Sequence, residues 1–342
     1  MTGVREYAGT PDSWNSFAAA QAGGTFCHWY GWKRVIEQVF GHECRYLGAY
    51  EGDTLTGVLP LVRVKSRLFG HYLVSMPFLN YGGPLGDTGA VRDLVAAAVE
   101  EARVSNAKLL ELRSTVPLEI DLPASHRKVT VVLDLPQTPE ELWKALSHGM
   151  RNKIRKPQKE KVEVRFGAAE LEPFWSIFSR HMRDLGTPTL PLGWFRAIQE
   201  TFGEGVWFAC AYHQGTAIAG GCGFVTPREF ELTWSSALNQ YRDLRANVLL
   251  HYSFMEAAVK RGVARFNFGR STPGSGTHEF KLQWGSRDEA LWWYQRAATS
   301  DAAAASTPSP HDSAYAWGPR VWKKLPLGLT NRLGPKIVRY LP

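Results

Sequence analysis

The run of residues best suited to chemistry spans positions 268–285 and reads FGRSTPGSGTHEFKLQWG. Gly274 and Gly276 would let a ligand approach the backbone closely, because glycine carries no side chain to block it. Phe280 and Trp284 are four residues apart, so they could pin a short helix to a core while Lys281 turns the other way. The alternative is a mobile loop with a solvated lysine, which the composition fits equally well.

The elements that must position this run occur twice in the chain. Trp32–Gly41, Ala49–Tyr50 and Thr54–Gly57 match Trp194–Gly203, Ala211–Tyr212 and Thr216–Gly220, at an offset of 162 residues until one residue is inserted before the last glycine. Each block predicts an amphipathic helix that ends at glycine, then a strand, a tight turn and a second strand. The copies also close alike, with a helix end and a strand over Ala97–Ser114 and Ala257–Ser271. We therefore expect an internally duplicated α/β protein.

The duplication predicts a first domain over residues 1–135 and a second over 136–298. Residues 299–313 are low in complexity and predict a linker. The tail at 314–342 mixes apolar residues with bases, and Pro319, Pro326 and Pro335 are expected to break it into short helices.

The composition is that of a globular protein, with 44% hydrophobic and 21% charged residues. We expect no signal peptide, because the N-terminus lacks a basic segment followed by an apolar run. We expect no membrane-spanning helix either, because apolar runs are too short. The four cysteines are scattered, which favours reduced thiols and a cytoplasmic location.

Positive charge is concentrated in two places, although the net charge is +8 overall. Residues 313–342 hold six bases and no acid, and residues 151–161 hold six more bases, beginning with Arg151. This placement indicates two anionic contact sites rather than a general nucleic-acid coat. The cluster at 151–161 could bind phosphates of tRNA or of a nucleotide- or lipid-linked sugar, or it could be a solvated helix face.

The tail combines its bases with aromatic residues such as Trp317, Trp322 and Tyr340. Such a mixture is typical of elements that lie on anionic membrane surfaces, here the inner face of the plasma membrane. The alternative is that the apolar residues dock on the body of the protein.

The run FNFGRS…GSGTHEFKLQWG resembles the C-terminal motif of FemAB-like proteins of the GNAT acyltransferase superfamily, in the branch associated with exopolysaccharide and PEP-CTERM sorting clusters. Further segments agree with this resemblance, and they are Phe69-Gly70, Ser75–Gly83, Met150–Arg155, Met182–Pro188 and Trp322–Leu327. The resemblance implies two tandem GNAT-like domains, with mixed sheets flanked by helices, and acyl transfer onto an amine in the second.

The same resemblance implies that Lys281 supplies positive charge to the oxyanion formed when an amine attacks an ester or thioester. A preorganised donor of this kind is worth about 10²–10³ in rate. Arg270 and Ser271 could hold a phosphate or carboxylate. Glu279 or His278 could act as general base, although a surface glutamate or a structural histidine is the plainer interpretation.

One stretch departs from the pattern of acetyl-CoA-dependent relatives, which carry a glycine turn that holds a pyrophosphate at a helix N-terminus. The corresponding stretch, YRDLRANVLL over residues 241–250, has no glycine. Asn247 could cap the helix, and Arg242 and Arg245 could meet an anion. The donor therefore stays open between acyl-CoA and aminoacyl-tRNA, with no tightly bound cofactor and no metal site expected.

In the first copy, Asn80, Tyr81, Gly82, Gly83 and Arg113 are candidates to line an acceptor groove between the halves. A structural turn and an interdomain ion pair are the alternative.

Taken together, the sequence predicts an N-acyltransferase that acts on an amino group of a cell-envelope saccharide, lipid-linked or peptidoglycan-type precursor. The rival hypothesis is a non-catalytic, membrane-docked partner in envelope or exopolysaccharide assembly.

Overall fold

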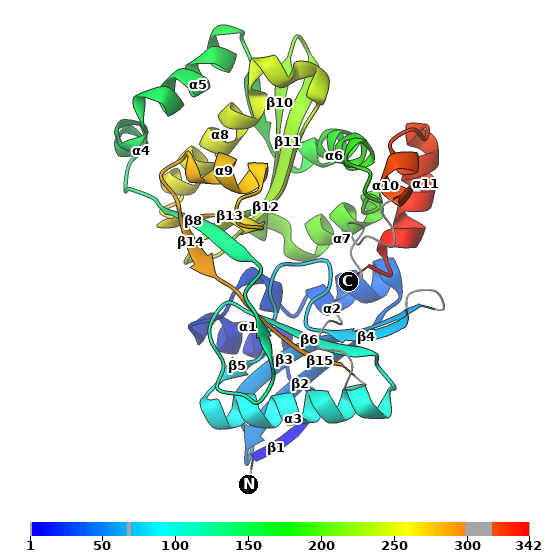
Figure 1. The fold of residues 1–342 in the computed structure, drawn as a ribbon. Coiled ribbons are helices and arrows are strands. Elements are labelled where there is room, and N and C mark those ends of the chain that lie inside the picture. Colours follow the sequence, from blue (N-terminus) through cyan, green and yellow to red (C-terminus); the bar gives the residue numbers. More distant parts are fainter. Residues whose placement is uncertain (1, 67–69, 298–316, 342) are drawn as a thin grey trace. The chain divides into compact units, whose positions relative to one another are not determined.

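A computed structural model describes residues 2–66, 70–297 and 317–341, so the expected linker at 299–313 lies outside the described residues. The chain forms two compact units, each built on one sheet (Figure 1). Of the described residues, the first unit comprises 2–66, 70–128, 290–297 and 336–341, and the second comprises 129–289 and 317–335.

The first unit is a mixed sheet covered by helices on both faces. Its strand order is β1 (Thr2–Glu6), β2 (Glu43–Glu51), β3 (Thr54–Ser66), β4 (Gly70–Val74), β6 (Leu109–Ser114), β15 (Trp292–Ala297) and β7 (Ala124–Ser125), with β5 (Leu85–Gly86) paired to β3. The helices are α1 (Pro11–Ala20), α2 (Trp32–Phe40) and α3 (Thr88–Val104), with a 3-10 turn at Phe26–His28. Apolar residues of α3 pack on Leu47, Leu59 and Leu110 of the sheet and form one core.

The second unit has the same plan. Its strand order is β14 (Arg287–Ala290), β8 (Val129–Asp134), β13 (Arg265–Ser271), β12 (Phe230–Ala237), β11 (Thr216–Val225), β10 (Val206–His213) and β9 (Glu163–Phe166). Its helices are α4 (Pro139–Ala145), α5 (His148–Lys159), α6 (Leu171–Leu185), α7 (Leu192–Phe202), α8 (Ala246–Lys260) and α9 (Gly276–Leu282), with 3-10 turns at Ala168–Glu170, Gly203–Gly205 and Asn239–Leu244. The core that α8 forms with the sheet includes Phe254, Phe266 and Trp284.

The predicted repeat of helix, hairpin, helix and strand is confirmed. The first copy is α2, β2, β3, α3 and β6, and the second is α7, β10, β11, α8 and β13. The first helix ends in each copy at a glycine with positive φ, Gly41 or Gly203, because only glycine adopts this conformation without strain. Each copy also inserts a third strand, β4 or β12, that the sequence comparison missed.

The division into units differs from the boundary expected at residue 135, because two strands join the sheet of the other half of the sequence. β8 pairs antiparallel with β13 in the second unit, and β15 pairs antiparallel with β6 in the first. β6 is buried along its whole length, so the backbone groups of its outer edge need a partner. A strand about 180 residues further along supplies that partner, and periodicity carries no signal for such a pairing.

The tail forms two helices, α10 (Trp317–Trp322) and α11 (Leu327–Val338). Pro326 precedes α11 as expected, but Pro335 lies inside that helix and does not break it. Tertiary packing holds the helix there: Gly334 is buried so closely that a side chain at this position would meet the backbone of Thr189. Among the described helices, none is long and apolar enough to span a bilayer.

Candidate functional site

The predicted run 268–285 lies where two parallel strands of the second unit separate. β12 and β13 pair only at Phe230↔Phe266 and Glu231↔Asn267, after which the described register ends. Beyond that point the backbones of the two strands no longer bond to each other. Peptide groups and side chains at the end of β13 therefore become available for other partners.

A bulge turns the end of β13. Its register with β8 shifts between Asn267 and Arg270, and Gly269 adopts φ +72° within the shift. The side-chain oxygen of Asn267 accepts hydrogen bonds from the Gly269 amide at 2.8 Å and from the Thr130 hydroxyl at 2.7 Å. The bulge is thus held in place from both sides, as expected where a strand redirects its side chains.

Lys281 lies on α9 and reaches back to this bulge. Its Nζ donates to the carbonyl oxygens of Gly269 at 2.8 Å and Arg270 at 3.1 Å. An ammonium group has three N–H donors, so one remains for a ligand. Burial lowers the pKa of Lys281 to about 8, with the charge of Glu231 opposing that shift and Arg270 adding to it.

The short helix that carries Lys281 is pinned as predicted. Trp284 is buried and Phe280 packs against the same core, where both rings contact the ring of His251. The Ser275 hydroxyl accepts from the His278 amide and caps the helix start. This packing rules out the alternative of a mobile loop with a solvated lysine.

The two residues that end β13 differ in exposure. Arg270 is exposed, whereas Ser271 is only 5% exposed. The Ser271 hydroxyl has no hydrogen-bond partner among the described residues. An unsatisfied buried hydroxyl costs about 1–3 kcal/mol, so such a group is commonly explained by an absent ligand or water.

His278 and Glu279 are placed differently from each other. The Gly274 amide donates to Nδ1 of His278 at 3.1 Å, so Nε2 carries the proton that it donates to Asp288 at 2.9 Å. Both ring nitrogens are therefore occupied in closing the Gly274 turn, which is a positioning role rather than that of a general base. Glu279 has a side chain that is 63% exposed, and it stays a candidate base.

The start of α8 corrects the expectation for Asn247. The helix begins at Ala246, and Asn247 lies inside it, where its carbonyl accepts from Nδ1 of His251 at 2.7 Å. Arg245 precedes the helix in the left-handed conformation, with φ +54°, and no side chain caps the N-terminus. The backbone at Arg245 thus has a conformation that glycine normally occupies, although the residue is arginine. Arg242 and Arg245 are both exposed at this end.

Two buried groups near Lys281 were not predicted. Glu231 is fully buried on β12, and its charge acts on Lys281. His251 lies on α8 among aromatic rings, and burial lowers its pKa to about 4, so it is neutral at pH 7. An acid within the apolar strand sequence FELTW and a histidine within an apolar helix were the available signals.

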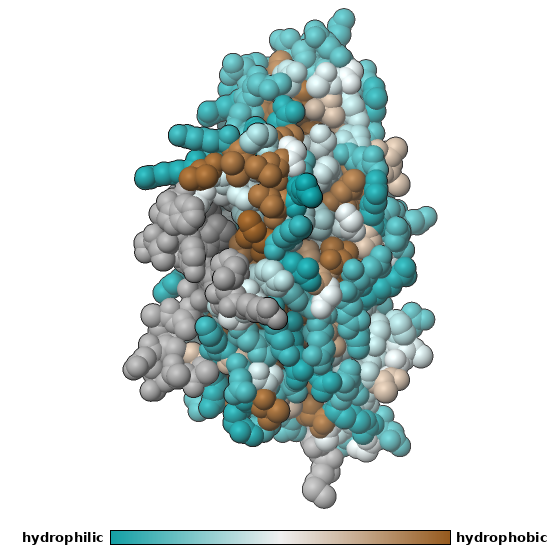
Figure 2. Space-filling view, turned by 90° about the vertical axis from the view of Figure 1, so that its right-hand side faces the viewer, coloured by the Kyte–Doolittle hydropathy of each residue, from teal (hydrophilic) through white to brown (hydrophobic). Residues whose placement is uncertain are grey.

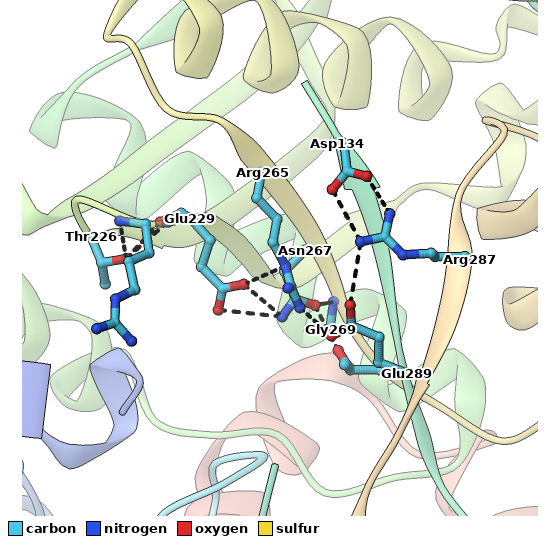
Figure 3. Close-up of polar contacts among 10 residues, drawn as sticks. Asp134, Thr226, Glu229, Arg265, Asn267, Gly269, Arg287 and Glu289 are labelled. Carbon is cyan, nitrogen blue, oxygen red and sulfur yellow. Dashed lines mark hydrogen bonds and ion pairs between the residues drawn. The ribbon is translucent and has the colours of Figure 1, made fainter. Parts of the chain in front are cut away.

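Ionic pairs hold the opposite end of the same strands together (Figure 3). Arg265 pairs with Glu229 and Glu289, and Arg287 pairs with Asp134 at 2.5 Å. Burial raises the pKa of Glu229, and Arg265 opposes that shift. This network joins β8, β13 and β14 to the turn before β12, so it stabilises the strands that carry the bulge.

The first-unit candidates are engaged within their own unit. Arg113 is 2% exposed, ion-pairs with Glu111 at 2.7 Å and donates to the carbonyl of Leu79 at 2.9 Å. The amides of Gly82 and Gly83 both donate to the Arg113 carbonyl. The ion pair of Arg113 with Glu111 therefore lies within the first unit. Tyr81 is buried, and Asn80 is half-buried.

Arg151 is likewise engaged, since it donates to the carbonyls of Trp143, Lys144 and Leu146 and so closes the C-terminus of α4. The exposed bases of the cluster are Arg155, Lys156, Lys159 and Lys161. Lys153 links α5 to the Lys281 helix through a 2.6 Å bond to Gln283. No cluster of metal-binding residues occurs within the described ranges.

Comparisons with known proteins agree with this geometry. The family model described as acetyltransferase (GNAT) domain matches residues 145–282, which contain β9–β13 and all of α9. No curated protein matches the sequence.

Three solved structures show the likeness of fold. A structure of FemX is 14% identical, with a TM-score of 0.65, covering 84% of this chain and 96% of that chain. The C-terminal domain of a protein described as a lysylphosphatidylglycerol synthetase from Agrobacterium fabrum is 11% identical, with a TM-score of 0.54 and coverage of 83% and 92%. A tandem GNAT protein from the clavulanic acid biosynthesis pathway is 13% identical, with a TM-score of 0.52 and coverage of 87% and 99%. Residues 145–282 therefore match the acetyltransferase (GNAT) domain model, within a mixed α/β fold similar to that of tandem GNAT structures.

Proposed function

We propose that this protein is an N-acyltransferase whose second unit transfers an acyl or aminoacyl group to an amine of a cell-envelope saccharide, lipid-linked or peptidoglycan-type precursor. The observation that carries the proposal is the position of Lys281. Its ammonium group is anchored on the Gly269 and Arg270 carbonyls, at the point where β12 and β13 separate. The buried Ser271 hydroxyl lies on the same strand end.

The reaction needs a cation more than a nucleophile from the protein. The amine nitrogen attacks the acyl carbonyl carbon, a C–N bond forms, and the carbonyl electron pair moves onto oxygen. The remaining N–H of Lys281 donates to this oxyanion. Collapse then breaks the C–S or C–O bond to the donor, the amine proton passes to Glu279 or water, and the leaving group takes a proton. A preorganised donor of this kind contributes about 10²–10³ in rate.

The donor binds, in this proposal, with its phosphates at the start of α8. Arg242 and Arg245 are exposed there, and the first amides of the helix have no side-chain cap. A helix N-terminus flanked by bases favours phosphate. Both acyl-CoA and aminoacyl-tRNA carry such phosphates. The name lysylphosphatidylglycerol synthetase denotes an aminoacyl product, which supports testing charged tRNA as well.

The test compares three variants in the same assay, with radiolabelled acetyl-CoA or aminoacyl-tRNA as donor and amino sugars or lipid-linked precursors as acceptors. We expect Lys281→Ala to lower turnover by about 10²–10³. Lys281→Arg, which keeps the charge, should retain more activity than Lys281→Ala. Lys260→Ala is the matched control, because Lys260 is an exposed lysine on α8 with a 61% exposed side chain. Turnover by Lys281→Ala at the wild-type rate would overturn the assignment.

The rival is a non-catalytic partner in envelope assembly, and it is favoured by the arginine that stands before α8 where acetyl-CoA-dependent relatives carry a glycine turn. Equilibrium binding of acyl-CoA and of charged tRNA separates the two ideas. A folded protein that binds neither donor would support the rival and refute the transferase. Binding of one donor that weakens in Arg242→Ala would support the transferase.

A further inference from the structure

We propose that the outward side of the α10–α11 tail is a docking surface for an anionic lipid bilayer, with the second unit held against it. This inference does not depend on the transferase. The surface, called the outer face below, comprises Val321, Leu329 and Leu333 together with exposed bases at Arg320, Lys323, Lys324 and Arg332.

The opposite side of the tail is fixed to the second unit, so the outer face has a defined orientation. Thr330 is 1% exposed, and Gly334 lies against Thr189. Near α10, a side chain added at Gly186 would meet Pro319 at 2.7 Å. The alternative interpretation, that the tail docks on the protein body, thus describes one side of the helices only.

The outer face exposes apolar side chains to an unusual degree. Val321 is 50% exposed, Leu329 41% and Leu333 36%. Leu185, at the end of α6 beside the Pro319 contact, is 50% exposed. These are four of the six large apolar residues that are exposed among the described residues, so the apolar surface is gathered here rather than scattered.

The charge of the outer face selects the partner. Residues 317–341 contain six bases and no acid, and the bases at 320, 323, 324 and 332 are exposed next to the apolar residues. Figure 2 shows this side of the molecule, with apolar surface beside long hydrophilic side chains. A nucleic acid would satisfy the bases but not the leucines. A bilayer satisfies both, since phosphate headgroups meet the bases while aliphatic side chains enter the acyl boundary.

Co-sedimentation of the full chain with vesicles tests the proposal. We expect binding to vesicles of equal parts phosphatidylglycerol and phosphatidylcholine, and loss of binding in 1 M salt or with phosphatidylcholine alone. Each base near an anionic surface contributes about fivefold in affinity, so Lys323→Ala/Lys324→Ala should weaken binding roughly 25-fold. Leu329→Glu/Leu333→Glu should weaken it at least tenfold.

Val104→Glu is the matched control, because Val104 is 62% exposed on α3, away from the tail. It should bind vesicles as the wild-type protein does, and thermal melting should show that all variants are folded. Three results would overturn the proposal: no binding to the anionic vesicles, equal binding to neutral ones, or a concentration-dependent dimer that Leu329→Glu/Leu333→Glu abolishes. Lys281→Ala should bind vesicles normally, so failure of the transferase assignment would be seen separately.

Discussion

The last strands of the two repeats, β6 and β13, end in the same arginine–serine pair but place the arginine in opposite environments. Arg113 is buried: its guanidinium pairs with Glu111, lies over the ring of Trp293 and donates to the carbonyl of Leu79. Arg270 is exposed. Glu111 is further bonded by Gln295 of β15 at 2.6 Å, so the first unit closes its strand end with its own polar groups.

The two strand ends also differ by one inserted glycine. The first copy reads Leu112-Arg113-Ser114, whereas the second reads Phe268-Gly269-Arg270-Ser271. Gly269 lies in the bulge, where β13 has one residue more than β8, and Arg270 beyond the bulge is exposed. The arginine of the same arginine–serine pair is thus buried in an ion pair in one copy and accessible at the strand end in the other.

Removal of the two arginines should therefore give very different results. We expect Arg113→Ala to lower the free energy of unfolding by about 3–5 kcal/mol, because Glu111 would remain buried without its cation. Arg270→Ala should change it by less than about 0.5 kcal/mol, as is usual for an exposed side chain. Urea unfolding followed by circular dichroism measures both. Equal losses of unfolding free energy in the two variants would mean that both arginines stabilise their strand ends to the same degree, which would contradict the comparison.

The pH dependence of turnover distinguishes the ammonium group of Lys281, which can lose its proton, from the guanidinium of an arginine, which stays charged. Because its pKa is lowered to about 8, the lysine is charged at pH 7 and loses its proton as pH rises through 8. By pH 10 the Lys281-dependent part of the rate should fall about a hundredfold. The wild-type rate divided by that of Lys281→Arg isolates this term from titration of the acceptor amine. A ratio that stays constant from pH 7 to 10 would contradict the role of the charge.

The bulge itself can be tested at Gly269. We expect Gly269→Ala to cost about 1–2 kcal/mol of stability, because a non-glycine residue is strained at φ +72°. It should also lower turnover, since the carbonyls that anchor Lys281 would shift. Gly276→Ala is the control, because a side chain there would meet nothing within 4 Å. If Gly269→Ala melts like the control, the backbone at Gly269 is not held at positive φ in solution.

The smallest effect concerns the helix start at Arg245. Arg245→Gly should be more stable than Arg245→Ala by about 1 kcal/mol, since both lose the side chain but only glycine relieves the left-handed backbone. Differential scanning calorimetry of the pair checks this. If the two melt together, or Arg245→Ala melts higher, the backbone at Arg245 is not left-handed in solution.

The sequence alone was sufficient for the repeated helix, hairpin, helix and strand and for the Lys281 helix, but not for β4 and β12. The repeat offset, the glycines that end α2 and α7, and the spacing of Phe280 and Trp284 are local signals, since each depends on residues within one or two turns. The two sheets flanked by helices followed from that pattern together with the family resemblance.

Only the tertiary structure decided how the elements are partnered. The crossing of β8 and β15, the burial of Arg113 and the engagement of both His278 nitrogens depend on residues that lie far apart in the chain or on the path of a loop. Pairing at a strand edge and desolvation of a charge are set by what surrounds a residue, and a single sequence does not display those surroundings. The left-handed backbone at Arg245 shows the same limit, because its conformation is imposed by the turn before α8 against the preference of the residue itself.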